Sequence, residues 1–228
     1  MAPSGEVAAP GPAYNLHMTT EYAPTMRAAG PYDRFFATVY DAVFWRGERA
    51  GMAGRRQALL AAASGRVLEI GAGTGLNLPF YPGGLELVLT EPEAPMARRL
   101  ERRAGGATIV RAPAEQLPFE DGAFDTAVST MVLCTVADAS RAIAELARVL
   151  RPGGRLLFIE HVRGDGALGR WQDRLDGAWR RIGNGCHANR DTLAALRAGG
   201  FAVEARHDTW RGMPHLIRPL VHGAATRT

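Results

Sequence analysis

A glycine-rich segment and a later glutamate carry the clearest chemical signature of this chain. Residues 69–75 read E-I-G-A-G-T-G after an apolar run, and Glu91 follows Gly73 by eighteen residues at the end of a second apolar stretch. Glycines directly after a buried strand let the backbone turn sharply and approach a ligand closely. A carboxylate about 20 residues beyond such a loop typically binds ribose hydroxyls. Together they predict a pocket for a nucleotide-type cofactor.

The glycine spacing separates two cofactor classes. The dinucleotide fingerprint is G-x-G-x-x-G, with its third glycine near a pyrophosphate. Here Gly71, Gly73 and Gly75 occupy every second position, and Leu76 stands where the dinucleotide fingerprint has its third glycine. Glu69 precedes the first glycine by two residues. This E-x-G-x-G-x-G pattern resembles motif I of the class I S-adenosylmethionine-dependent methyltransferases. In that family the acidic residue and the glycine backbone hold the methionine part of the cofactor, which has no pyrophosphate and requires no phosphate-binding helix end.

Further segments extend the resemblance from Tyr32 to the C-terminus. Residues 117–125 look like the L-P-F-x-x-x-x-F-D stretch of many small-molecule methyltransferases, and residues 148–154, R-V-L-R-P-G-G, look like the helix end beyond it. Four shorter segments resemble the methyltransferase-like group whose animal members methylate alkyl thiols; they are residues 132–134, 160–162, 175–179 and 185–186. The resemblance implies S-adenosyl-L-methionine as the cofactor and a thiol as the favoured acceptor.

Three features depart from the family pattern. Glu91 stands where these relatives usually carry Asp, although either carboxylate accepts two hydroxyl donors. Pro113 stands where many family members carry an Asp that accepts from the adenine amino group, so adenine is expected to rely on backbone and apolar contacts. Residues 1–30 are rich in Ala, Pro, Gly and Thr and lack the membrane-anchoring helix of the animal members. We expect a disordered tail there.

Composition narrows the function classes. The 228 residues are 46% hydrophobic and 22% charged, as expected of one globular domain. A net charge of +4 is too small to indicate nucleic-acid binding. Neither a signal peptide nor a membrane span is apparent, which favours the cytoplasm. The arginines at positions 98, 99, 102 and 103 are expected to form a solvated helix face, with peripheral contact to an anionic membrane as the alternative.

Hydrophobic periodicity predicts the elements that position these residues. Two helical pieces, at 32–45 and 54–63, precede an alternation of strands and helices. Strands are expected at 66–70, 85–90, 107–111, 124–130, 155–160, 201–207 and about 216–224, and helices at 76–80, 94–103, 139–150, 168–181 and 190–198. This predicts a single α/β domain over 31–228, a Rossmann-like doubly wound seven-stranded sheet with helices on both faces. The resemblance implies an antiparallel last strand and an acceptor-covering insertion at 163–189.

Open α/β sheets bind ligands beyond the carboxyl ends of their strands. The expected cofactor-binding residues are those of the glycine loop and the following strand ends, namely Glu69, Gly71, Ala72, Gly73, Thr74, Gly75, Asn77, Glu91, Pro92, Met96, Ala114, Glu115, Thr130 and Met131. Tyr32, Tyr40 and Phe44 are expected either to close over the cofactor or to pack in the core.

Fewer residues are candidates for the acceptor side. His161 follows a predicted strand and could orient the acceptor or take its proton, or be satisfied by a backbone partner. Its neighbour Glu160 is expected to anchor nearby loops. Asp176 and His187 lie in the predicted insertion and are candidates for the acceptor pocket. Two further pairs are expected to pack in the core: Trp171 with Trp179, and the isolated cysteines Cys134 and Cys186. No metal or nucleophilic role is expected of the cysteines.

The leading hypothesis is S-adenosylmethionine-dependent methyl transfer to a small molecule by in-line displacement, with a thiol acceptor favoured. O-, N- or C-methylation of a natural product, quinone or lipid head group is the nearest alternative. An NAD-dependent oxidoreductase and a catalytically silent cofactor-binding domain are hypotheses of other classes. The sequence indicates neither the oligomeric state nor the identity of the acceptor.

Overall fold

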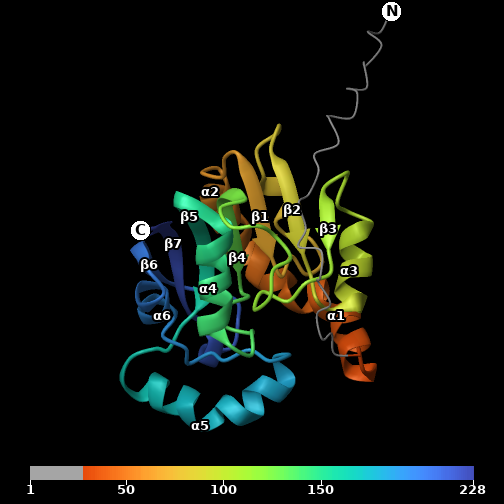
Figure 1. Ribbon diagram of the computed structural model, residues 1–228. Helices are drawn as coiled ribbons and strands as arrows, with labels where there is room; N and C mark the ends of the chain where they lie inside the picture. Colours follow the sequence, from red (N-terminus) through yellow and green to blue (C-terminus); the bar gives the residue numbers. More distant parts are fainter. Residues whose placement is uncertain (1–27) are drawn as a thin grey trace, which may run out of the picture.

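The computed structural model describes residues 28–228, so the tail predicted over residues 1–30 lies almost wholly outside the described part. Seven strands form one sheet in the order β3-β2-β1-β4-β5-β7-β6 (Figure 1). β7 runs antiparallel to both of its neighbours, and the other pairs are parallel. The strands are Arg66–Ile70 (β1), Glu86–Thr90 (β2), Thr108–Val110 (β3), Phe124–Thr130 (β4), Leu150–His161 (β5), Phe201–Thr209 (β6) and Pro219–Arg227 (β7).

Helices cover both faces of the sheet because its central strands are apolar on both sides. Successive residues of a strand point to opposite faces. On β1, Val67 packs with Leu60 of the helix before the strand, whereas Leu68 packs with Ile143 and Leu146 of α4. The helices are α1 (Pro31–Gly47), α2 (Ala53–Leu60), α3 (Ala94–Glu101), α4 (Ala139–Val149), α5 (Gly166–Ile182) and α6 (Thr192–Ala198). The predicted doubly wound α/β sheet is confirmed.

Two local predictions need correction. Residues 76–80 were expected to form a helix, but only a 3-10 turn, Leu78–Phe80, is present. Pro79 lacks a backbone donor and Pro82 restricts the residue before it, so the segment cannot extend into an α-helix. The R-P-G-G segment does follow the end of α4, and Gly153 has a φ of 73°. However, β5 already begins at Leu150, which pairs with Phe124.

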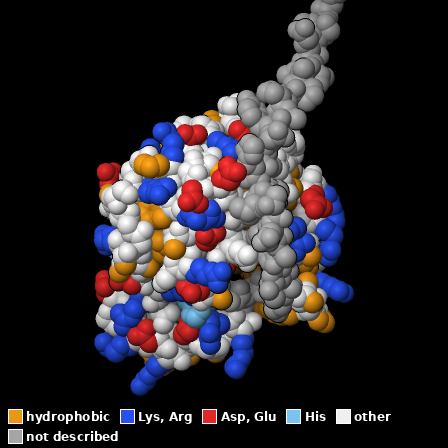
Figure 2. Space-filling view, in the orientation of Figure 1, with side chains coloured by type: hydrophobic (Ala, Val, Ile, Leu, Met, Phe, Trp, Pro, Cys, Tyr) orange, Lys and Arg blue, Asp and Glu red, His pale blue; other side chains and the backbone are white. Residues whose placement is uncertain are grey.

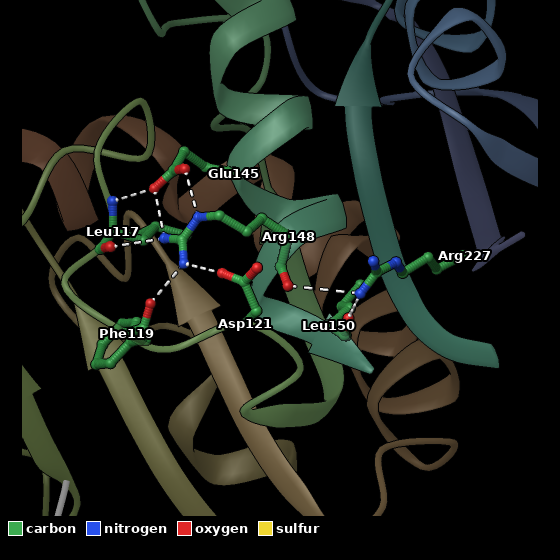
Figure 3. Close-up of polar contacts among 7 residues, drawn as sticks. All are labelled: Leu117, Phe119, Asp121, Glu145, Arg148, Leu150 and Arg227. Atoms are coloured by element: carbon green, nitrogen blue, oxygen red, sulfur yellow. Dashed lines mark hydrogen bonds and ion pairs between the residues drawn. The ribbon is translucent and has the colours of Figure 1, made fainter. Parts of the chain in front are cut away.

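Arg148, near the end of α4, holds the loop that leads into β4 (Figure 3). Its guanidinium donates to the carbonyl oxygens of Leu117 (2.9 Å) and Phe119 (2.6 Å) and pairs with Glu145 and Asp121. Glu145 in turn accepts from the backbone N–H of Leu117 at 2.7 Å. The side chain of Arg148 therefore supplies hydrogen bonds to carbonyl oxygens of a loop that lies outside the strands of the sheet.

Replacing Arg148 with Met should lower the free energy of unfolding by about 2 kcal/mol, because two loop carbonyls and two carboxylates lose a charged donor. Urea unfolding of the two proteins measures the difference. Arg151→Met is the matched control, since Arg151 is 60% exposed and pairs only with Asp125 at the surface. It should change stability by less than about 0.5 kcal/mol. Equal losses of stability in Arg148→Met and Arg151→Met would contradict the conclusion that Arg148 holds the loop.

Among residues 28–228, no helix is both long and apolar enough to cross a membrane. Figure 2 shows acidic and basic side chains interspersed on the face that carries α4 and α6. This face therefore lacks the uniformly positive surface that binds the phosphate backbone of a nucleic acid.

Candidate functional site

A cavity of about 280 Å³ opens at the carboxyl ends of β1, β2, β4 and β5. Several segments line the cavity: the glycine loop after β1, the segment after β2, the loop after β4, the end of β5, and parts of α1 and α5. In Figure 1, α5 lies across this end of the sheet, away from the other helices. The cavity thus occupies the position predicted from the topology of open α/β sheets.

Glu91 forms part of the cavity wall and also fixes the glycine loop. Its carboxylate accepts from the backbone N–H of Gly73 at 2.8 Å and from that of Glu93 at 2.7 Å. One oxygen is used by each bond, so each retains a lone pair for a further donor. Burial raises the pKa of Glu91 to about 7, while the two backbone bonds and Arg111 oppose the rise.

The three glycines of the loop differ in how much space surrounds their Cα atoms. Each has a positive φ: 54° at Gly71, 59° at Gly73 and 87° at Gly75. A Cβ at Gly71 would lie 2.8 Å from Val132, and one at Gly75 would lie 2.6 Å from Leu78, so these positions are closed by packing. A Cβ at Gly73 would meet nothing closer than 3.9 Å. Gly73 thus exposes its backbone to the cavity, whereas Gly75 does not line it.

Glu69 lies beneath the loop in a buried polar network. Its two oxygens accept from Asn77 Nδ2 (2.9 Å) and the Tyr81 hydroxyl (2.8 Å). Asn77 also donates to Thr130 and accepts from Arg56. These groups border a smaller hollow beside the main cavity, and Gly71 and Gly73 line both. Burial raises the pKa of Glu69 to about 7.

Replacing Glu69 with Gln should make stability less dependent on pH. The unfolded carboxyl releases its proton near its reference pKa of 4.5, and the folded one only near 7. Glu69 therefore stabilises the fold fully below pH 4.5, and this contribution is lost as pH rises through 7. Gln keeps both hydrogen bonds, through its oxygen to Asn77 and its amide to Tyr81. Between pH 5 and 8, the variant should gain up to about 3 kcal/mol over the parent.

Urea unfolding of the cofactor-free protein at the two pH values measures this gain. Asp173→Asn is the control, because hydrogen bonds from Arg163 and Asn189 hold the pKa of this exposed carboxyl below its usual range, outside the interval. Its stability difference from the parent should stay constant from pH 5 to 8. A constant difference for Glu69→Gln as well would show that the buried carboxyl is already ionised at pH 5.

The glycine loop is tied to α1. Thr74 donates from its hydroxyl to Asp41 of α1 at 2.6 Å. Arg103 bonds both the carbonyl oxygen of Thr74 (3.0 Å) and Asp41 (2.5 Å). One of the four arginines expected on a solvated face therefore joins α1 to the loop.

A row of aromatic rings closes one side of the cavity. Tyr32, Phe36, Tyr40 and Phe44 repeat every fourth residue along α1, with successive ring centroids 6.0, 5.5 and 4.7 Å apart, and Phe44 stacks on Trp210. Phe36, Tyr40 and Phe44 line the cavity, while the Tyr32 hydroxyl donates to the carbonyl oxygen of Ile182 at the end of α5. The row thus connects α1 with α5 across the cavity.

Glu160 organises the loop after β4, as expected. Its buried carboxylate accepts from the hydroxyl of Ser129 (2.6 Å) and from the backbone N–H groups of Val132, Leu133 and Cys134 (3.0–3.1 Å). Burial raises its pKa and these four donors oppose the rise. The carboxylate therefore fixes the backbone of the loop that places Cys134 at the cavity.

His161 lies beside both cysteines of the described chain. Its Nδ1 is 3.6 Å from the sulfur of Cys134 and 3.5 Å from that of Cys186, and the two sulfurs are 3.9 Å apart. All three residues are buried and line the cavity. The contact between the thiols lowers the pKa of Cys186, as does His161, and it raises the pKa of Cys134 together with burial. The cysteines were expected only to pack. The position of Cys134 after β4 was a signal that could have placed it at the cavity, whereas Cys186 lies between α5 and α6 and gave no such signal.

Asp176 and His187 contact each other instead of the cavity. His187 Nδ1 is 3.1 Å from an Asp176 oxygen, and the other oxygen faces Arg180 at 3.5 Å. Both residues are absent from the cavity lining, because their polar atoms are directed at this pair between α5 and the following loop. From α5, Trp179 lines the cavity. Trp171 was expected to pack in the core, but it is 55% exposed.

Of the residues expected to bind the cofactor, all but Gly75 fall into two groups. The main cavity is lined by Gly71, Gly73, Glu91, Pro92, Met96, Ala114, Glu115 and Met131, together with His161. The smaller hollow is bordered by Glu69, Ala72, Thr74, Asn77 and Thr130. Glu115 also accepts from the backbone N–H groups of Ala137 and Asp138, just before α4.

Comparison with known proteins agrees with this geometry. Residues 68–158 match the model of a methyltransferase domain. The chain is 34% identical over 171 residues to thiol S-methyltransferase TMT1A of Homo sapiens, covering 71% of this chain and 70% of that protein. It is 37% identical over 183 residues to thiol S-methyltransferase TMT1B of Homo sapiens, covering 74% of each. The chain belongs to the S-adenosylmethionine-dependent methyltransferases.

A solved structure extends the similarity beyond the matched domain. The crystal structure of a methyltransferase from Thermotoga maritima, described as a possible histamine N-methyltransferase, superimposes with a TM-score of 0.65 at 26% identity. The match covers 86% of this chain and 98% of that one. The similarity in fold therefore extends over most of the chain, beyond residues 68–158.

S-adenosylmethionine fits the residues present. Gly73 leaves its backbone open toward the cavity, and the carboxylate of Glu91 stands at the wall with a free lone pair on each oxygen. Met96 and Ala114 provide apolar walls, as expected for adenine in the presence of Pro113. In this methyltransferase, Glu91 would hold the ribose hydroxyls, and the glycine loop would hold the methionine part.

Proposed function

We propose that this methyltransferase transfers the methyl group of S-adenosylmethionine to the sulfur of a small thiol. The observation that carries the proposal is the composition of the cavity end opposite Glu91. That end includes two thiols and an imidazole, from Cys134, Cys186 and His161, and the imidazole lies 5.5 Å from the ring of Trp210. The similarity to two thiol S-methyltransferases supports the same acceptor class.

The chemistry of this end suits a thiol better than a hydroxyl. S-adenosylmethionine supplies a methyl group already activated on a sulfonium. A thiol has a pKa near 8.5, so it needs little help to react as thiolate, whereas an alcohol needs a strong base. Of the carboxylates that line the cavity, Glu91 and Glu93 follow β2, and Glu115, which follows β3, already accepts from two backbone N–H groups before α4. Glu160 is close to Cys134 but does not line the cavity, and its carboxylate already accepts four hydrogen bonds. Cys134, Cys186 and His161 therefore offer sulfur and nitrogen contacts to the acceptor.

The protein's main contribution is orientation in a dry site. The aromatic row of α1 and Trp179 of α5 give the cavity apolar walls, which favour a site with little water around the reacting groups. Positioning of two reactants can lower a barrier by several kcal/mol, up to about 7–11 kcal/mol in ideal cases. His161 is placed to orient the acceptor at this end.

The test is transfer of a labelled methyl group to a panel of small thiols, phenols, amines and lipid head groups, with Glu91→Ala as the cofactor-binding control. We expect turnover on thiols in the parent and its loss in the variant. Turnover confined to phenols, amines or lipid head groups would reject the thiol assignment and keep the enzyme class.

A further inference from the structure

The three side chains at the acceptor end come from three separate segments. Cys134 lies in the loop after β4, His161 ends β5, and Cys186 lies between α5 and α6. Their ligand atoms, Sγ, Nδ1 and Sγ, all lie within 4.8 Å of one another. The side chains are almost completely buried, with 0%, 5% and 5% of their residue surfaces exposed. The convergence therefore depends on the tertiary fold and not on a local sequence motif.

We propose that Cys134, His161 and Cys186 bind a zinc ion whose fourth coordination position faces the cavity and receives the sulfur of the methyl acceptor. The identity of the acceptor rests on the function proposed above, whereas the metal site itself does not.

The distances among the three atoms match one face of a zinc tetrahedron. Zinc binds sulfur at about 2.3 Å and nitrogen at about 2.0–2.1 Å, so tetrahedral angles require sulfur–sulfur separations of about 3.8 Å and sulfur–nitrogen separations of about 3.6 Å. The observed values are 3.9 Å between the sulfurs and 3.6 and 3.5 Å from each sulfur to Nδ1. A disulfide would need the sulfurs to approach to about 2.05 Å.

The ligand set also has the right chemistry and charge. Thiolates and imidazole favour zinc over calcium or magnesium, which prefer oxygen. Two thiolates neutralise the double charge of the ion, which limits the cost of placing it among apolar side chains. Sites with three protein ligands are characteristic of catalytic zinc, whose fourth position is left for water or substrate. Here all three ligands line the cavity, so that position is accessible from it.

Surrounding hydrogen bonds hold the loop of Cys134 in place without an ion, whereas Nε2 of His161 has no hydrogen-bond partner among the described residues. The backbone N–H of Cys134 donates to Glu160 at 3.1 Å, and its carbonyl accepts from the N–H of His187 at 2.7 Å. The second bond joins the loop of Cys134 to the segment that carries Cys186. Arg190 adds bonds to the carbonyl oxygens of Leu133 and Val136, both at 2.6 Å. Such supporting contacts are typical of metal sites, where they fix ligand orientation.

The ion would activate the acceptor directly. A thiol that binds at the fourth position loses its proton to solvent and becomes a zinc-bound thiolate. Its sulfur donates an electron pair to the methyl carbon, and the bond from that carbon to the sulfonium breaks, leaving its pair on the cofactor's sulfur. The products are a neutral thioether and S-adenosylhomocysteine, and the thioether is the weaker zinc ligand. This assigns His161 to metal binding and not to proton transfer.

The test uses untagged full-length protein stripped with a chelator and titrated with Co²⁺, which reports zinc-type sites by absorption. We expect one equivalent to produce a sulfur-to-cobalt charge-transfer band and the visible bands of a tetrahedral ion. Zn²⁺ should abolish both. Cys134→Ser and Cys186→Ser should each lose about half of the charge-transfer intensity, because one of the two thiolates remains, and should weaken Zn²⁺ binding at least 100-fold. The control His207→Gln removes an exposed histidine of β6 and should bind Co²⁺ like the parent.

A small thiol added without S-adenosylmethionine should shift the visible cobalt bands, because it replaces water at the fourth position. Absence of the tetrahedral spectrum in folded, reduced protein would overturn the inference, even if thiols are methylated. An unshifted spectrum with a thiol that is a good substrate would overturn acceptor coordination. A cobalt site in a protein that methylates only other acceptors would support the metal site and reject the proposed function.

Discussion

Glu91→Ala should weaken binding of S-adenosylmethionine at least 100-fold while the protein stays folded. Two hydrogen bonds to the ribose hydroxyls are lost, and bonds to a charged acceptor contribute about 1.5–3 kcal/mol each. The substitution also removes the acceptor of the Gly73 and Glu93 N–H groups. Because these groups border the cavity, water can replace the carboxylate there, and the fold should lose only about 1–2 kcal/mol.

Calorimetric titration with the cofactor measures the affinity, and thermal unfolding verifies the fold. Glu91→Asp retains a carboxylate and should lose less affinity than Glu91→Ala. Since the pKa of Glu91 is raised to about 7 by burial, affinity in the parent should fall as pH drops below 7. Glu91→Ala should lack this dependence. A folded Glu91→Ala protein with unchanged affinity would reject the assignment of the cofactor pocket.

Glu160→Leu should be the most destabilising of the substitutions considered. The leucine leaves four buried donors unpaired, the hydroxyl of Ser129 and three consecutive N–H groups after β4. Each unpaired donor costs about 1–3 kcal/mol, so the loss should exceed about 4 kcal/mol. That is a large part of the 5–15 kcal/mol typical of a whole domain. We expect poor folding or a strongly lowered urea midpoint.

Glu160→Gln tests the same contacts in a protein that still folds. Its carbonyl oxygen can replace the carboxylate oxygen that serves Ser129, Val132 and Leu133, so only the bond from Cys134 should be lost. Its stability should lie between those of the parent and of Glu160→Leu. The control Glu204→Leu, at an exposed position of β6, should change stability by less than about 0.5 kcal/mol. Similar losses in the two leucine variants would show that the buried bonds contribute little.

Sequence patterns predicted the sheet well because its signals are local. β1 and β4 begin and end where periodicity placed them, at Arg66–Ile70 and Phe124–Thr130. Each is an apolar run bounded by turn residues, and burial on both faces allows little else. The prediction of a helix at 76–80 was wrong because two prolines outweigh a short apolar stretch.

The cofactor end of the site was also readable from the sequence. The chain needs positive φ angles after β1 and a carboxylate after β2, and parallel pairing brings these two strand ends together. The glycines and Glu91 therefore identify this end by residue type and spacing alone.

The acceptor end was decided by the tertiary structure. Cys134, His161 and Cys186 are separated by 27 and 25 residues, and no periodicity relates them. They meet because Glu160 directs the loop after β4, while α5 returns its following segment to the same strand ends. Asp176 and His187, of equal promise as residue types, pair with each other outside the cavity. Residue type and spacing thus determined the fold and the glycine loop, whereas long-range packing decided which reactive side chains line the other end of the cavity, because that depends on contacts between segments distant in the chain.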